Sequence, residues 1–115
     1  MVKGKVVLVA FPFDDFSATK VRPAVCLTNT IGIHQHIILA FISSQIPIDL
    51  SETDLALDSM DIDFALTGLR VSSIIRLHRL MTVTTGLIKR ELGELSPRLQ
   101  IEVNNKVRKL FDLCN

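Results

Sequence analysis

The sequence predicts a mainly β domain, in which an antiparallel sheet curls into a small barrel and one amphipathic helix follows at the C-terminus. Short apolar and β-branched runs recur as far as residue 84 without a long helical pattern between them, which favours antiparallel strands. The apolar residues adopt helical spacing only near the end of the chain. At 115 residues the chain is expected to form a single domain, 1–115, with its own core.

The predicted strands are the apolar runs in chain order. Clear strand signals cover 5–11, 23–29, 36–43 and 73–79, and weaker ones lie near 55–57 and 81–84. Between them, 45–69 is the least regular stretch of the chain. Several short strands in succession are typical of a small curled sheet.

Two helices are predicted after the last strand. Ser96 followed by Pro97 indicates a helix N-terminus, because serine caps a first turn and proline suits its first position. Apolar residues then recur at helical spacing, at Leu99, Val103, Val107, Leu110 and Phe111. A shorter helix is predicted over 87–92, ended by Gly93.

The composition excludes several classes of protein. No apolar run reaches the roughly 18–20 residues of a membrane span, and the N-terminus lacks the pattern of a signal peptide. A cytoplasmic protein with no membrane partner is therefore expected. Cys26 lies inside a predicted strand and Cys114 near the end of the chain, and neither belongs to a CxxC or a zinc-type spacing. We expect reduced thiols and no metal site.

The charges are segregated along the chain, although the net charge is only +1. Residues 45–69 contain six acids and no base, whereas residues 70–109 contain nine bases and three acids. Two interpretations stay open at this point. The charges either form solvated loops and a basic helix face, or they create a local positive surface on a nearly neutral protein.

Polar residues at the ends of predicted strands carry the candidate chemistry. There is no GxxxxGK[ST], HExxH or GxSxG motif, so nucleotide hydrolysis, zinc proteolysis and α/β-hydrolase chemistry have no support. The remaining candidates are Arg22 in "VRPA", Ser43, Ser44 and Gln45 in "FISSQIP", and Arg76 and His78 in "IIRLHRL". Strand alternation predicts that Arg76 and His78 share one face, with Arg79 on the other.

A guanidinium, a hydroxyl and an imidazole are groups with which phosphodiester cleavage proceeds without a metal. Arginine stabilises charge on phosphate oxygens, a hydroxyl donates to one of them, and histidine moves protons at neutral pH. Each candidate also has a simpler structural interpretation: Arg22 as a surface charge, the serines as a strand end, and His78 as a hydrogen-bonded strand residue. Spacing alone does not show that they converge.

Three runs of the sequence, taken in order, carry a resemblance: "GKVVLVAFPFDDFSATKVRPAVCLTN", "IILAFISSQIP" and "GLRVSSIIRLHRLMTV". Together they resemble the MazF/PemK family of ribonuclease toxins from bacterial toxin–antitoxin systems, over nearly the whole chain. The resemblance implies a small SH3-like β-barrel with short helices that forms a homodimer. It also implies a metal-independent endoribonuclease without cofactors, which cuts single-stranded RNA, including mRNA, at short sequences and is inhibited by a cognate antitoxin protein.

The resemblance implies a set of catalytic residues. Arg22 matches the arginine before proline that the family uses at the scissile phosphate. Ser43 stands where most members have threonine, and Ser44 matches a position that is often small or hydroxylated. Arg76 matches the arginine of an Arg-x-Asp pair in the PemK-like branch, and His78 replaces the aspartate. That replacement either keeps a proton acceptor or marks altered specificity or lost activity.

The resemblance also implies RNA contacts from the polar loop over residues 12–21, which borders the RNA groove in the family. The implied RNA-binding residues are Phe16, Ser17, Thr19 and Lys20 in this loop, and Ser44 and Gln45 after the strand at 36–43. Phe16 is the candidate for stacking on an unpaired base. Ser17 departs from members that carry an acid at its position.

In the implied mechanism, the ribose 2′-hydroxyl attacks the adjacent phosphate, His78 takes its proton, Arg22 stabilises the developing charge and Ser43 orients a phosphate oxygen. The products would be a 2′,3′-cyclic phosphate and a 5′-hydroxyl, and loss of mRNA would inhibit translation and growth. The alternative is a catalytically weakened SH3-like barrel that binds RNA or an antitoxin peptide without cleavage. A purely structural role is the third possibility.

Overall fold

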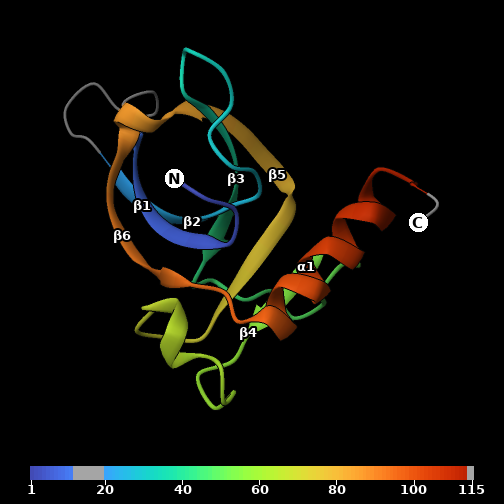
Figure 1. Ribbon diagram of the computed structural model, residues 1–115. Helices are drawn as coiled ribbons and strands as arrows, with labels where there is room; N and C mark the ends of the chain where they lie inside the picture. The colour runs from blue at the N-terminus through green and yellow to red at the C-terminus, as the bar shows by residue number, and fades with distance from the viewer. Residues whose placement is uncertain (12–19, 114–115) are drawn as a thin grey trace.

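The fold is a strongly curved antiparallel sheet followed by one helix (Figure 1). The computed structural model describes residues 1–11 and 20–113. In chain order, the elements are β1 (Lys5–Phe11), β2 (Lys20–Cys26), β3 (His36–Ser43), β4 (Asp54–Leu57), the 3-10 turn η1 (Ala65–Thr67), β5 (Ser73–Thr84), the 3-10 turn η2 (Thr85–Leu87), β6 (Ile88–Glu94) and α1 (Pro97–Leu110).

All strand pairs are antiparallel, and the strand order across the sheet is β4-β5-β3-β2-β1-β6. Figure 1 shows the sheet curling until β5 and β6, which η2 joins, meet at one end. Within the described residues the sheet is not closed, because β4 and β6 are its two edges. The predicted mainly β fold with a C-terminal helix is therefore confirmed, as a sheet that is barrel-like and open.

Strands β2 and β3 separate at a proline. The two strands pair only from Ala24, opposite Phe41, to Cys26, opposite Leu39. Pro23 comes directly before this ladder and has no N–H to extend it. Beyond Pro23, β2 continues along β1 alone, as far as the pair Lys20 and Phe11. This strand begins three residues before the predicted start at residue 23. The separation leaves room beside Arg22.

Strand β5 contains a bulge that changes its register against β3. Ala40 lies opposite Leu80, but the next residue, Phe41, lies opposite Arg76. The residues of β5 between those two, 77–79, are therefore skipped by the ladder with β3. A bulge of this kind bends a strand and re-aims its side chains. The sequence predicted two strands here, at 73–79 and 81–84, and the structure has one bent strand.

The core consists of two clusters, one on each face of the sheet. Adjacent strand residues alternate between them, so that Val6 belongs to one cluster and Val7 to the other. Helix α1 covers the first cluster with Leu99 and Val103, which pack with β4 and β5 residues such as Leu55. Figure 1 accordingly shows α1 beside β4.

The start of α1 follows the prediction from the sequence. Ser96 is the N-cap residue, its hydroxyl accepts the N–H of Leu99 at 3.2 Å, and Pro97 occupies the first helical position. Among the described residues, no helix is long and apolar enough to cross a membrane.

The predicted helix over 87–92 is wrong, because these residues belong largely to strand β6. Leucine, lysine, arginine and glutamate favour helices intrinsically, but the edge of β1 offers backbone partners, with Lys5 opposite Glu94 and Leu8 opposite Arg90. Gly93 lies within this strand and does not end a helix. A Cβ there would approach the Leu66 carbonyl oxygen to 2.2 Å, so glycine allows β6 to pack closely against η1.

Candidate active site

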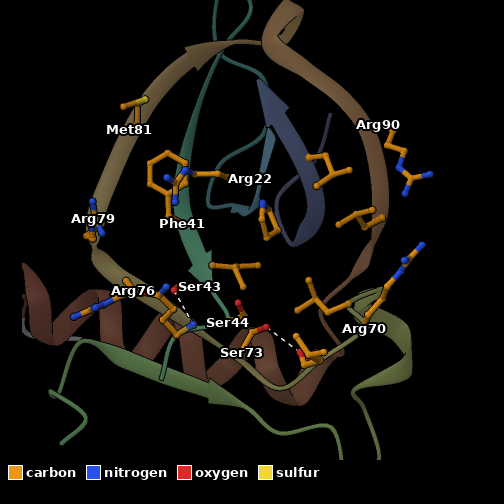
Figure 2. Close-up of a pocket in the computed structure, with 18 residues that line it drawn as sticks. Arg22, Phe41, Ser43, Ser44, Arg70, Ser73, Arg76, Arg79, Met81 and Arg90 are labelled. Atoms are coloured by element: carbon orange, nitrogen blue, oxygen red, sulfur yellow. Dashed lines mark hydrogen bonds between the residues drawn. The ribbon is translucent and has the colours of Figure 1, made fainter. Parts of the chain in front are cut away.

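A cleft of about 1010 Å³ lies in the concavity of the sheet, where β2 and β3 separate. Five arginines line it, together with three serines and Gln45 (Figure 2). The polar lining consists of Arg22, Ser43, Ser44, Gln45, Arg70, Ser73, Arg76, Arg79 and Arg90. Phe41, Met81, Leu8 and Leu92 are among its apolar walls.

The fold gathers the arginines from four parts of the chain. Figure 2 shows Arg76 and Arg79 on the β5 side of the cleft, Arg90 and Arg70 on the opposite side, and Arg22 between them. Arg90 stands opposite Leu8 in the β1–β6 ladder, and Arg22 opposite Val9 in the β1–β2 ladder. A concave surface lined by one sign of charge attracts anions.

Among residues 1–11 and 20–113, only one of these arginines has an acidic partner. The Nε–H of Arg76 donates to Oδ1 of Asp54 at 3.2 Å. Burial alone would raise the pKa of the Asp54 carboxyl. Hydrogen bonding by Ser51 and the charges of Arg76 and His78 outweigh burial, so this pKa lies below its ordinary value. The cleft therefore keeps most of its positive charge.

Two of the three cleft serines, Ser43 and Ser73, make short local hydrogen bonds. The backbone N–H of Gln45 donates to Oγ of Ser43 at 3.1 Å, so the hydroxyl hydrogen of Ser43 is left for another acceptor. Ser73 is buried, and its hydroxyl donates to the carbonyl oxygen of Val71 at 2.9 Å. Ser44 follows the end of β3 and is exposed at the cleft.

His78 does not line the cleft together with Arg76. His78 is exposed, and its Nδ1 lies 2.8 Å from Oγ1 of Thr53. Arg79 lines the cleft in its place. The prediction that Arg79 lies on the other face from Arg76 is therefore wrong, because both line the cleft. The physical reason is the β5 bulge over 77–79, which interrupts the alternation of side chains. Ile75 and Leu77 pack in one core cluster, in line with the alternation predicted for Arg76 and His78.

The remaining candidate RNA-binding residues divide into three groups. Ser44 and Gln45 line the cleft. Lys20 is exposed at the start of β2 and is not among the lining residues. Phe16, Ser17 and Thr19 lie outside the described residues.

Three cleft arginines were not singled out from the sequence: Arg70, Arg79 and Arg90. The signal that points to them is the excess of bases over residues 70–109, which contain all three. The charge pattern predicted a local positive surface as one of two interpretations. It did not say which of the bases would face the same cleft, because that depends on the curl of the sheet and on the β5 bulge.

The comparisons with known proteins agree with the resemblance noted in the sequence. The model of the PemK-like, MazF-like toxins of type II toxin–antitoxin systems matches residues 2–111. No curated protein sequence is significantly similar to the chain.

Several solved structures share the fold. A MazE-MazF complex from Deinococcus radiodurans matches with a TM-score of 0.76 at 16% identity, covering 99% of this chain and 97% of that one. The Mycobacterium tuberculosis toxin MazF-mt6 matches with a TM-score of 0.74 at 18% identity, covering 96% and 99%. An endoribonuclease in complex with its cognate antitoxin, from a mycobacterial species, matches with a TM-score of 0.74 at 14% identity, covering 100% and 98%. At these identities the likeness establishes the fold. Because the family model matches nearly the whole chain, the protein belongs to the PemK-like, MazF-like toxins of type II toxin–antitoxin systems.

Proposed function

We propose that this toxin is a metal-independent endoribonuclease that cleaves single-stranded RNA in the arginine-lined cleft. The observation that carries the proposal is the convergence of Arg22 from β2 and Ser43 from the end of β3 on one cleft, with four further arginines around them. A phosphodiester backbone is the extended anion that such a cleft suits.

The proposed reaction is an intramolecular transesterification. The ribose 2′-hydroxyl gives its proton to water and attacks its own phosphate, and the bond to the 5′ oxygen breaks. That oxygen takes up a proton from water, so the products carry a 2′,3′-cyclic phosphate and a 5′-hydroxyl. Arg22 stabilises the negative charge that develops on the phosphate. The hydroxyl of Ser43, whose oxygen already accepts the Gln45 N–H, donates to a phosphate oxygen. DNA lacks the nucleophile and is expected to survive.

The geometry supports electrostatic catalysis and gives no support to His78 as the general base. His78 lies outside the cleft lining and is hydrogen-bonded to Thr53. Among the described residues that line the cleft there is neither a carboxylate nor an imidazole. The proposal therefore assigns charge stabilisation to Arg22 and Arg76 and assigns no proton transfer to His78.

The proposal also covers the partners of the protein and its effect on the cell. We expect a cognate antitoxin that inhibits the enzyme, as two of the similar structures are complexes of a toxin with an antitoxin. We also expect a homodimer in the cytoplasm whose cleavage of mRNA inhibits translation and growth. Each of these is a proposal for this chain.

The test is incubation of the purified protein with a long single-stranded RNA in excess EDTA. Wild type is expected to give discrete fragments with 2′,3′-cyclic phosphate ends, and Arg22→Ala is expected to give none. Arg108→Ala removes an exposed arginine on α1, outside the cleft, and serves as the matched control with undiminished cleavage. Intact RNA with the folded wild type would contradict the proposed activity. Retention of that intact RNA, with a steep salt dependence, would favour a module that binds RNA without cleaving it.

A further inference from the structure

Asp54 is a buried carboxylate directly behind one of the cleft arginines. It is the first residue of β4 and stands opposite Arg76 in the β4–β5 ladder. Its side chain is only 1% exposed, whereas that of Arg76 is 29% exposed. Asp54 itself is not among the residues that line the cleft. Its carboxylate is therefore placed to act on the cleft through Arg76 alone.

The two oxygens of Asp54 have different partners. Oδ1 accepts the Nε–H of Arg76 at 3.2 Å, and Oδ2 accepts the backbone N–H of Ser51 at 3.0 Å. The contact to Ser51 fixes the carboxylate, and the contact to Nε fixes the plane of the guanidinium. Since Asp54 engages Nε, the N–H groups on the two η nitrogens of Arg76 are left for other acceptors.

Arg76 differs in this respect from the other cleft arginines. Within residues 1–11 and 20–113, no acid lies within ion-pair distance of Arg22, Arg70, Arg79 or Arg90. A long, unpaired arginine samples many rotamers, and binding a phosphate must then overcome that entropy. A buried charge without its partner is costly, so the pair of Asp54 and Arg76 is strongly maintained.

We propose that Asp54 is a positioning residue, which holds the guanidinium of Arg76 by its Nε at the β5 side of the cleft so that the η N–H groups donate to a phosphate of the bound RNA. The proposal rests on the function proposed above, in that the ligand is RNA. Asp54 does not contact the substrate, and its effect is transmitted entirely by Arg76.

A double-mutant cycle tests this dependence. Asp54→Asn is expected to lower kcat/KM for single-stranded RNA about tenfold in the wild-type background, since small misplacements of a positioning group are costly. In an Arg76→Ala background the same change is expected to have an effect of less than about twofold, because the group it positions is gone. Glu91→Gln, which removes an acid that pairs with Lys5 outside the cleft, is the matched control and is expected to leave kcat/KM unchanged. Equal losses from Asp54→Asn in both backgrounds would overturn the proposal and leave a structural role.

A second measurement on the wild type does not depend on cleavage. In nitrogen-15 spectra of the arginine side chains, the Nε–H of Arg76 is expected to exchange with water more slowly than that of Arg79, which has no acidic partner in the described chain. In Asp54→Asn this protection is expected to be lost. Exchange of Arg76 as fast as that of Arg79 in the wild type would overturn the proposal, even if the variant does not fold. A wild type that protects Arg76 but cleaves no RNA would instead refute the proposed function and leave the positioning of Arg76 standing.

Discussion

Arginines in two regions of the molecule have opposite surroundings. At the start of α1, Arg98 contacts three acids, with distances of 2.6 Å to Asp61, 3.0 Å to Asp63 and 3.2 Å to Glu102. In the cleft, Asp54 is the only acid that pairs with any of the five arginines, as far as the described residues show. The acidic stretch 45–69 therefore neutralises Arg98 and Arg76 and leaves the rest of the cleft positive.

This difference distinguishes charges that are paired within the fold from charges that are left for the proposed RNA ligand. Matched charges at α1 anchor the loop at 58–64 to the helix, through Arg98 and through Ser96, whose hydroxyl donates to Asp63 at 2.8 Å. Unmatched like charges that share a concavity repel one another, and an anionic ligand relieves that repulsion. The clustering is therefore what the proposed RNA binding requires, and it does not stabilise the fold.

The largest expected effect is the loss of activity in Arg22→Ala. Removing a charge that stabilises the transition state is expected to lower kcat about a hundredfold to a thousandfold. The melting temperature is expected to stay the same or to rise slightly, because an unmatched charge is removed. Steady-state kinetics and thermal denaturation check the two parts. A variant that loses as much thermal stability as Arg98→Ala would show that Arg22 is structural and would break the comparison.

The next largest effect is expected at Gly93, where β6 packs against η1, the turn that precedes Arg70. In Gly93→Ala the new Cβ would meet backbone atoms of Leu66 and Thr67 at 2.2–2.7 Å. We expect a loss of about 2–4 kcal/mol in the free energy of unfolding, measured by urea denaturation. Gly86→Ala, whose Cβ would meet only Thr84 Oγ1 at 3.7 Å, is the control and is expected to be nearly neutral. Similar stabilities for the two variants would contradict the packing of η1 against β6.

The pair of Asp54 and Arg76 is expected to stabilise the fold in a pH-dependent manner. Because the folded state lowers the pKa of Asp54, the contribution of this carboxylate is complete above its unfolded pKa of about 3.9 and is lost as the pH falls through the folded value. Asp54→Asn is therefore expected to be less stable than wild type at pH 7, by on the order of 1–2 kcal/mol, and the difference is expected to shrink below about pH 4. Denaturant titrations across this range check the sign. Asp49→Asn, at an exposed position, is the control and is expected to have the same stability as wild type across this pH range. A stability difference between Asp54→Asn and wild type that widens in acid would contradict the lowered pKa of Asp54.

A smaller effect is expected in the salt dependence of RNA binding. Each phosphate contact on a single strand contributes about 0.7 to the slope of log affinity against log salt. Arg79→Ala and Arg90→Ala are each expected to reduce the slope by about that amount, measured with an RNA whose 2′-hydroxyls are methylated to prevent cleavage. Arg108→Ala, on the outer surface of α1, is expected to leave the slope unchanged. Equal slopes for all variants would show that the unmatched arginines do not contact phosphate.

The sequence predicted most elements because local patterns determine them. Short continuous apolar runs define β1 and β3 at the predicted bounds, and Ser96 with Pro97 defines the start of α1. The failures have tertiary causes. The segment that forms β6 has helical propensity but pairs with the edge of β1. Because of the β5 bulge, Arg79 lines the cleft and His78 does not. No local pattern encodes a bulge whose position depends on two neighbouring strands.

The smallest expected effect belongs to Arg98, despite its three ion pairs. Its side chain is about half exposed, so water and salt screen its interactions and each pair contributes little. Arg98→Ala is expected to lower the melting temperature slightly, and the difference is expected to shrink at 1 M salt. Cleavage of RNA by the folded variant is expected to stay within about twofold of wild type, since Arg98 lies outside the cleft lining. A larger loss of activity in a variant that is fully folded would show that the loop at 58–64 positions Arg70. The start of α1 and the cleft would then form one functional unit.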